Sequence, residues 1–425
     1  MTESFLHYIW QFQYFDKKDL VTTEGESITI LKTGFYNTHA GPDFSQAKIK
    51  IGELEWIGNV EIHIQASEWQ QHKHHHDKAY DNVVLHVVWK NDKVITRSDG
   101  SLVPTVELKN RIEDSLLVSY KNLVNQPAPI PCAHALHTVN SLIRISALDR
   151  ALAQRLESKA RQILKSLEEN NNDWEETFYQ LLGKNFGFKV NSEAFHALTK
   201  AIPYRSLLKH SDKLLQLEAM LFGTAGFLDK VKDDYAQSLQ REYGLLQSKF
   251  SLTKKQLNES QWRFLRLRPA NFPTLRIAQF ATLLSERKNF FSTILATTSV
   301  IELKELFDVT QCTYWQTHYR FDKKSKKPVP GLGEAAIENI IINTIVPTLA
   351  AYSMYKDESS WMDRAIDFLS KISPEKNSII SEWKALGWSV TSAFDSQALI
   401  ELRNNFCQKR LCLQCTIGHI LIRKP

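Results

Sequence analysis

The period of the hydrophobic pattern changes once along the chain, and this change sets the fold class. Between residues 20 and 109, apolar and polar residues alternate in short runs separated by turn signals such as Gly41-Pro42 and Asp99-Gly100, which is typical of β-strands. From Thr138 onward the apolar residues recur at helical spacing, as in the long run over 141–170. The sequence therefore predicts an α+β protein in which a small mixed β-sheet precedes a large all-helical region.

A proline-rich segment marks the predicted domain boundary. The run QPAPIPCAH, residues 126–134, is dense in proline, which breaks helices and exposes the backbone. With 425 residues, 43% of them hydrophobic, the chain is long enough for two or three domains that each bury a core. We predict four segments: an N-terminal α/β domain over 1–125 that opens with a helix over 3–14, a proline-rich linker over 126–137, a helical domain over 138–306 and a helical C-terminal region over 307–425.

Composition favours a cytoplasmic protein. No apolar run approaches the roughly 20 residues that a membrane span needs, and the first residues carry neither a basic leader nor a cleavage site. We therefore expect a cytoplasmic location and no membrane partner. The net charge of +6 mildly favours a polyanionic partner such as nucleic acid. The oligomeric state has no signal in the sequence.

Two acids in neighbouring predicted strands indicate a cation site. Asp43 precedes the strand-like run 47–51 and Glu61 lies within the run 59–65, so both carboxylates are expected at one edge of the sheet. Such oxygens suit Mg²⁺ or Mn²⁺, which orient a phosphodiester and lower the pKa of an attacking water. His63 shares a strand face with Glu61, because side chains at i and i+2 of a strand point the same way. We predict Asp43, Glu61 and His63 as catalytic residues.

These residues resemble the motifs of the PD-(D/E)XK nuclease superfamily. Pro42-Asp43 matches the first motif, and Glu61-Ile62-His63 matches the acid-x-lysine motif with histidine in place of lysine. The resemblance implies a restriction-endonuclease-like core, in which a helix, here 72–80, follows the second motif and a strand, here 82–89, follows that helix. It also implies metal-dependent cleavage of DNA or RNA. The missing lysine leaves a second hypothesis open, a catalytically inactive nucleic-acid-binding or scaffold protein.

A run of histidines near the sheet offers further candidate ligands. It reads HKHHHD over residues 72–77, and imidazole and carboxylate groups bind Zn²⁺, Mn²⁺ or Fe²⁺. His72 and His76 form the best pair, since they lie one turn apart if the run is helical. The alternative is a solvated helix start or loop. This run supports a third hypothesis, a hydrolase of another kind whose transition metal survives the loss of Glu61.

Three cysteines near the end of the chain predict a second metal centre. Cys407, Cys412 and Cys415 follow a C-x4-C-x2-C pattern, close enough to hold one metal. The fourth ligand is left open: His419 completes a Cys₃His zinc site, whereas Cys132 or Cys312 completes a Cys₄ site for zinc or an iron–sulfur cluster. Buried unligated thiols are the alternative.

A cluster of arginines is the candidate nucleic-acid contact. The segment QWRFLRLRPANFPTLRIAQ over 261–279 surrounds aromatic residues with basic ones, and arginine grips phosphate while aromatic rings stack on bases. The alternative is a helical bend whose arginines pair with acidic neighbours. The predicted nucleic-acid-binding residues are Arg263, Arg266, Arg268 and Arg276.

At the scale of the whole chain, the sequence resembles a bacterial family catalogued as a domain of unknown function, family 2851. The shared blocks are GPDF at 41–44, VEIH at 60–63, RLRPANFPTLRIAQ at 266–279 and the cysteines near the end. This resemblance implies a domain layout and no activity. Our leading hypothesis is a divergent metal-dependent nuclease-like protein in which Asp43 and Glu61 bind the cation and His63 assists.

Overall fold

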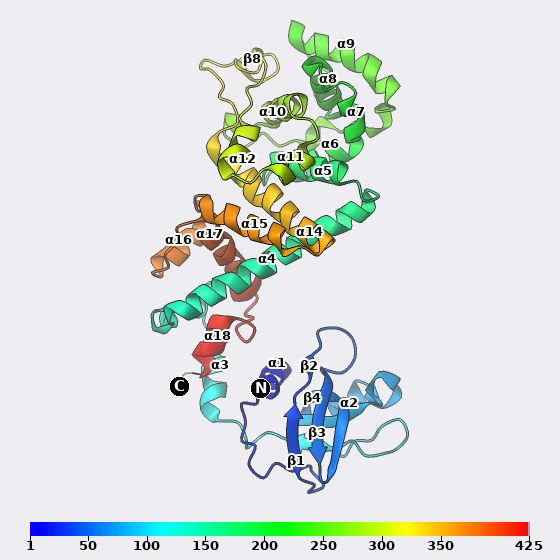
Figure 1. The fold of residues 1–425 in the computed structure, drawn as a ribbon, viewed down its shortest axis with the longest axis vertical. Helices are drawn as coiled ribbons and strands as arrows, with labels where there is room; N and C mark the ends of the chain where they lie inside the picture. The colour runs from blue at the N-terminus through cyan, green and yellow to red at the C-terminus, as the bar shows by residue number, and fades with distance from the viewer. Residues whose placement is uncertain (424–425) are drawn as a thin grey trace. The chain divides into compact units, whose positions relative to one another are not determined.

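A computed structural model describes residues 1–423, which fall into two compact units (Figure 1). Unit 1 is Met1–Ala147 together with the chain from Leu402 onward, and unit 2 is Leu148–Glu401. The predicted α+β class is confirmed, because a mixed sheet in unit 1 precedes a large helical region. The proline-rich segment 126–137 lies inside unit 1, and the division between the units falls within helix α4 (Ser141–Glu169).

The sheet of unit 1 has the strand order β1-β3-β4-β5-β6, with β2 also paired to β3. Strands β1, β3 and β4 are antiparallel, whereas β4, β5 and β6 run parallel. The predicted strands 47–51, 59–65 and 82–89 are confirmed as parts of β3, β4 and β5. The bounds are β1 Ile28–Lys32, β2 Phe35–Tyr36, β3 Phe44–Ile51, β4 Leu54–Gln65, β5 Val83–Lys90 and β6 Thr105–Glu107.

The central strands are held close together. In β5, residues 83–88 are all buried, as expected for a strand that is covered on both faces. Gly58 lets β4 approach β5, because a Cβ added there would lie 2.4 Å from Val84 Cγ1 and 2.6 Å from the Asn82 carbonyl oxygen. This close approach fixes the parallel register that positions the polar side chains described below.

Helix α1 (Glu3–Phe12) packs against β4. The Thr2 hydroxyl caps the helix by accepting a hydrogen bond from Phe5 N–H at 3.3 Å, and Gln13 ends it in the left-handed region. Near the other end of the chain, α18 (Thr416–Arg423) packs against α3 (Asp114–Val124), as Figure 1 shows. Unit 1 is thus completed by residues from both ends of the described chain.

The crossover from β4 to β5 differs from the predicted helix over 72–80. It consists of the short helix α2 (Glu68–Gln71) and two 3₁₀ turns, η1 (His74–His76) and η2 (Lys78–Tyr80). The prediction was wrong because Lys73 adopts a left-handed conformation, with φ of 63°, and interrupts any helix that includes it. Unit 1 also contains η3 (Ala133–Thr138) and η8 (Leu402–Cys407), a π-helical turn.

Unit 2 is built from helices, as the periodicity predicted. Helix α4 begins after Asn140, whose side chain accepts a hydrogen bond from Leu142 N–H at 2.9 Å, and it ends where Asn171 and Asn172 adopt positive φ. Unit 2 also contains an antiparallel hairpin of β7 (His318–Arg320) and β8 (Lys323–Lys324). The other helices are α5 Trp174–Phe186, α6 Ser192–Ala201, α7 Tyr204–Leu208, α8 Leu214–Thr224, α9 Asp234–Lys249, α10 Pro273–Glu286, α11 Phe290–Ala296, α12 Val300–Phe307, α13 Glu334–Ile340, α14 Val346–Lys356, α15 Ser359–Lys371, α16 Ser378–Ala385 and α17 Ala393–Glu401, with shorter turns η4 Thr253–Lys255, η5 Glu259–Gln261, η6 Pro269–Asn271 and η7 Ile341–Ile345.

One helical run of unit 2 is long and apolar enough to cross a membrane by length and composition. It extends over Glu334–Lys356 and combines α13, η7 and α14, whereas the sequence had predicted no run of this kind. Inside the protein, 67% of its most apolar window is buried. The run therefore also fits the core helix of a folded unit.

Candidate metal centre

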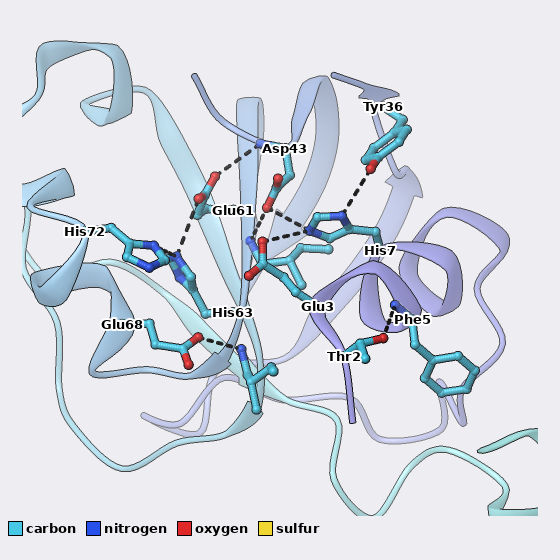
Figure 2. A network of polar contacts seen from close by, with 12 residues as sticks. Thr2, Glu3, Phe5, His7, Tyr36, Asp43, Glu61, His63, Glu68 and His72 are labelled. Carbon is cyan, nitrogen blue, oxygen red and sulfur yellow. Dashed lines mark hydrogen bonds and ion pairs between the residues drawn. The ribbon is translucent and has the colours of Figure 1, made fainter. Parts of the chain in front are cut away.

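Strand register brings Asp43 and Glu61 together at one edge of the sheet. Phe44 of β3 pairs with Val60 of β4 in an antiparallel ladder, so the residue before the strand lies opposite Glu61. Asp43 N–H donates a hydrogen bond to Glu61 Oε2 at 3.1 Å, and Ile62 N–H donates to Asp43 Oδ2 at 3.0 Å (Figure 2). Each carboxylate is therefore fixed by the backbone of the strand that carries the other one.

Three histidines gather beside Glu61. His63 lies on the same face of β4, with Nε2 at 3.6 Å from Glu61 Oε1, and His74 in η1 places its Nε2 at 3.4 Å from the same oxygen. His63 Nε2 is also 3.2 Å from His72 Nδ1. One ligand atom from each of His63, His72 and His74 lies within 4.8 Å of the others. The crossover turn and the strand thus present several imidazoles to one small volume.

A second set of donors faces Asp43 from helix α1. His7 Nε2 lies 3.2 Å from Asp43 Oδ2 and 3.6 Å from Glu3 Oε1. Figure 2 shows Glu3 and His7 turned toward Asp43, while Tyr36 OH contacts His7 Nδ1 at 3.3 Å. Sequence reasoning missed Glu3 and His7. Their spacing of four residues, which places both on one helix face, is the signal that could have found them.

Burial sets the protonation states in the site. Glu61 is only 5% exposed, and this burial, with a further contribution from the Asp43 carboxylate, raises the pKa of Glu61 to about 9. Burial also lowers the pKa of His74 to about 4 and lowers that of His63 further, because its neighbours His86, His74 and His72 disfavour a positive charge. The protein alone therefore keeps these imidazoles neutral, with lone pairs that can bind a metal.

The donor geometry fits a cation. His7 Nε2 and His74 Nε2 are buried and face carboxylate oxygens, yet neither forms a hydrogen bond of acceptable geometry. Such orphaned nitrogens are costly unless another group uses them. Carboxylate oxygens mixed with imidazole nitrogens form a donor set for Mn²⁺, Fe²⁺ or Zn²⁺, and nitrogen ligands suit these ions better than Mg²⁺.

Neither His86 nor His76 belongs to the two groups of candidate metal ligands described above. His86 of β5 is fully buried, and its Nε2 lies 2.8 Å from His63 Nδ1, so it orients the His63 ring. His76 is exposed, and its ring lies against that of His75 with 3.9 Å between centroids. The helical spacing on which the predicted His72 and His76 pair rests is absent, since Lys73 breaks the helix, and His74 takes the place next to His72.

The predicted cysteine ligands are distributed over both units. Cys407, Cys412, Cys415 and Cys132 are buried in unit 1. Cys312 belongs to unit 2, where its Sγ contacts Tyr235 OH at 3.2 Å. His419 directs its Nε2 to Tyr14 OH at 3.1 Å. Among the alternatives for a fourth ligand, Cys132 and His419 therefore lie in the same unit as the three cysteines of the tail, whereas Cys312 does not.

The arginine cluster contains both exposed and buried members. Arg263, Arg266 and Arg268 are exposed on an irregular segment, in which Arg266 adopts positive φ. Arg276 is only 6% exposed, and its guanidinium donates to Gln279 and Asn271 at 2.8 and 2.7 Å. Arg276 is thus enclosed by its own helix and loop, whereas the other three arginines predicted to bind nucleic acid are exposed.

Comparison with known proteins identifies a family and no activity. A family model described as "Protein of unknown function (DUF2851)" matches residues 3–378, which include the candidate metal centre and Cys132 and end before Cys407. No curated protein matches the chain. No solved structure matches it either. The match extends over most of the 425 residues, and the chain therefore belongs to the DUF2851 family.

Proposed function

We propose that unit 1 is a divergent, divalent-metal-dependent nuclease-like hydrolase of phosphodiesters. The observation that carries this proposal is the interlocked pair of carboxylates from Asp43 and Glu61, flanked by imidazoles on both sides. A buried carboxyl with a pKa near 9 is unfavourable to ionise unless a positive charge compensates it. A bound cation supplies that charge, which is why we assign Asp43 and Glu61 as its ligands.

The order of elements supports a nuclease-like assignment. Helix α1 precedes strands β3 and β4, a short helical crossover follows, and β5 then runs parallel to β4. This is the succession that the resemblance to the PD-(D/E)XK superfamily implies, with Asp43 before the first strand of the pair and Glu61 and His63 on the second. The helical crossover is shorter than expected and contributes His72 and His74 instead of a full helix.

The side chains around the two carboxylates have distinct proposed roles. A cation held here would orient a phosphodiester and lower the pKa of water. Burial lowers the pKa of His63, so its imidazole is neutral at physiological pH and can offer a lone pair to a cation, which a lysine ammonium cannot do. Glu3 and His7 are placed to hold a second group next to Asp43. The exposed residues Arg263 and Arg268 are candidate phosphate contacts of unit 2.

The test is a cleavage screen with Asp43→Asn. We expect the parent, supplied with Mn²⁺, to cleave at least one of single- or double-stranded DNA or RNA, and we expect the variant to lose at least 100-fold in rate, since removing a group that stabilises the transition state costs rates of this order. Asp99→Asn, an exposed acid in a turn of the same unit, is the matched control and should retain full activity. Circular dichroism checks that both variants fold.

Two outcomes would redirect the assignment. Equal cleavage by the parent and Asp43→Asn would rule out this site as the source of activity. A parent protein that binds nucleic acid in a salt-sensitive manner, does not cleave it and ignores Mn²⁺ would instead identify a binding or scaffold protein.

A second candidate function rests on the imidazole set alone. His63, His72 and His74 bring three nitrogen donors within 4.8 Å, a ligand set that suits zinc or iron in other hydrolases. In that case metal binding would survive Glu61→Gln and would be lost in His72→Asn, an exposed position where substitution leaves the core intact. The nuclease-like proposal predicts instead that Glu61→Gln loses affinity for Mn²⁺, because Glu61 is one of its two assigned ligands.

A further inference from the structure

Four cysteines of unit 1 lie on two segments that are distant in sequence and that carry none of the residues of the carboxylate site. Cys407 ends η8, Cys412 lies in the following turn and Cys415 directly precedes α18, while Cys132 directly precedes η3. All four are buried, with exposed fractions between 6% and 8%. These side chains are therefore largely shielded from solvent.

The backbone of the tail is folded tightly around these thiols. The Cys407 carbonyl accepts a hydrogen bond from Arg410 N–H at 3.1 Å, and the Cys412 carbonyl accepts one from Cys415 N–H at 3.3 Å. Gly418 permits this fold, because a Cβ there would lie 2.1 Å from the Cys412 carbonyl oxygen. Arg410 Nη1 donates to the Ala128 carbonyl at 3.0 Å and ties the tail to the segment that carries Cys132.

Two ordinary explanations fit these thiols poorly. All five cysteines of the described chain are free, so the group is not a pair of disulfides. Buried thiols that serve only as small core residues need not lie at the ends of turns in two contacting segments that are about 275 positions apart in sequence. Cysteines on irregular turns of two neighbouring segments are instead the usual form of a structural metal site.

We propose that Cys132, Cys407, Cys412 and Cys415 bind a metal centre through four thiolates. Thiolate is a soft ligand that selects zinc or an iron–sulfur cluster, and both bind as deprotonated cysteines. The metal supplies the positive charge that the buried thiolates need. This centre is separate from the carboxylate site and does not depend on the proposed nuclease-like activity.

The centre has a structural consequence for the carboxylate site. Helix α18 begins directly after Cys415 and places the His419 ring against Phe12, with 4.5 Å between centroids. Tyr8 OH also lies 3.5 Å from the His419 carbonyl oxygen. Both aromatic residues belong to α1, the helix that carries Glu3 and His7. A metal bound by the cysteines would therefore support the helix that faces Asp43.

The test is metal analysis of the full-length protein purified without oxygen from cells supplied with zinc and iron. We expect either about one zinc per chain, or iron with acid-labile sulfide and a visible absorption that bleaches on reduction. Cys132→Ser should lower the bound metal at least tenfold. Cys312→Ser is the matched control, because Cys312 lies in unit 2 beside Tyr235, and it should retain the full metal content.

A second measurement keeps the proposal testable if Cys132→Ser does not fold. A thiol-binding mercurial is titrated into the parent protein, and the release of zinc or iron is followed against the number of thiols modified. If zinc or iron is released as four protected thiols are modified, the result supports a metal centre bound by four cysteines. A folded parent that contains no metal, or metal that stays bound after all of its thiols have been modified, would overturn it.

Discussion

Glu61 combines two opposite demands, since its burial favours the neutral acid and metal binding requires the anion. Its pKa is raised from 4.5 to about 9 in the metal-free protein, so its contribution to stability is fully present below pH 4.5 and is lost as the pH rises toward 9. A glutamine resembles the neutral acid in shape and has no proton to lose. The substitution Glu61→Gln should therefore stabilise the metal-free protein and weaken its metal binding.

We predict that Glu61→Gln raises the free energy of unfolding of the metal-free protein at pH 8 by about 1–3 kcal/mol. At pH 4.5 the parent and the variant should be nearly equal, because near the pKa of the unfolded chain it costs little free energy to protonate Glu61 on folding. Urea unfolding in the presence of a chelator at both pH values measures the difference. A variant that is less stable at pH 8 would show that Glu61 is ionised in the metal-free site.

The buried histidines predict that the free energy of unfolding changes with pH in the opposite direction at acidic pH. Burial lowers the pKa of His86 to about 3 and lowers that of His63 as well, while in the unfolded chain both titrate near 6.5. Below pH 6.5 the unfolded state binds more protons than the folded state, so stability falls as the pH falls, by up to about 1.4 kcal/mol per pH unit for each such histidine. We expect the proton uptake on unfolding, which sets the slope of stability against pH, to be about one proton smaller in His86→Asn than in the parent. An unchanged slope between pH 6 and pH 4.5 would contradict the assignment of His86 as a buried neutral imidazole.

The sequence predicted the residues on strands better than those on turns and helices. Asp43, Glu61 and His63 could be placed together because a strand fixes side-chain direction with a period of two. His74 could not be chosen over His76, since that choice depends on the left-handed conformation of a single residue, Lys73, for which a lysine gives no warning.

At the scale of elements, the contact between β4 and β5 determines whether the site assembles. Gly58→Ala would drive a methyl group into the Val84 side chain and the Asn82 carbonyl, and one of the strands would have to move. We predict a loss of about 2–4 kcal/mol in the free energy of unfolding, comparable to other overpacking and backbone-strain effects.

The control for this prediction is Gly244→Ala in helix α9, where an added Cβ meets no atom within 4 Å. That change should stabilise the protein by a few tenths of a kcal/mol up to about 1, because alanine favours helix more than glycine does. Thermal unfolding of both variants measures the contrast. Equal effects would show that the two strands can separate at Gly58 without cost.

At the scale of the whole molecule, the two units have separate cores, so ligands of unit 1 should stabilise unit 1 in particular. A cation present at 100 times its dissociation constant adds about 2.7 kcal/mol to the unit that binds it. We predict that Mn²⁺ slows hydrogen exchange in α1, β3 and β4 by up to about 100-fold. Exchange in α5 and α10 of unit 2 should not change. Equal slowing in both units would show that they open as a single cooperative body.

The domain layout was the part that local sequence signals could not supply. Periodicity separates sheet from helix, and that division is confirmed, but it cannot show that the chain from Leu402 onward groups with residues 1–147. This grouping depends on contacts such as Arg410 with Ala128 and Tyr14 with His419, which are remote in sequence. The prolines of 126–134 suggested an exposed linker, whereas Ile130 and Cys132 are buried in unit 1.

The return of the tail to the first unit also imposes an order on synthesis. A ribosome releases the sheet, with Asp43 and Glu61, long before it releases α18, and unit 2 is made in between. At translation rates of about 5–20 residues per second, the first unit therefore stays incomplete until the ribosome reaches the segment that begins at Leu402. A chain that is broken off before Cys407 would carry every candidate catalytic side chain and none of the segment that completes their unit.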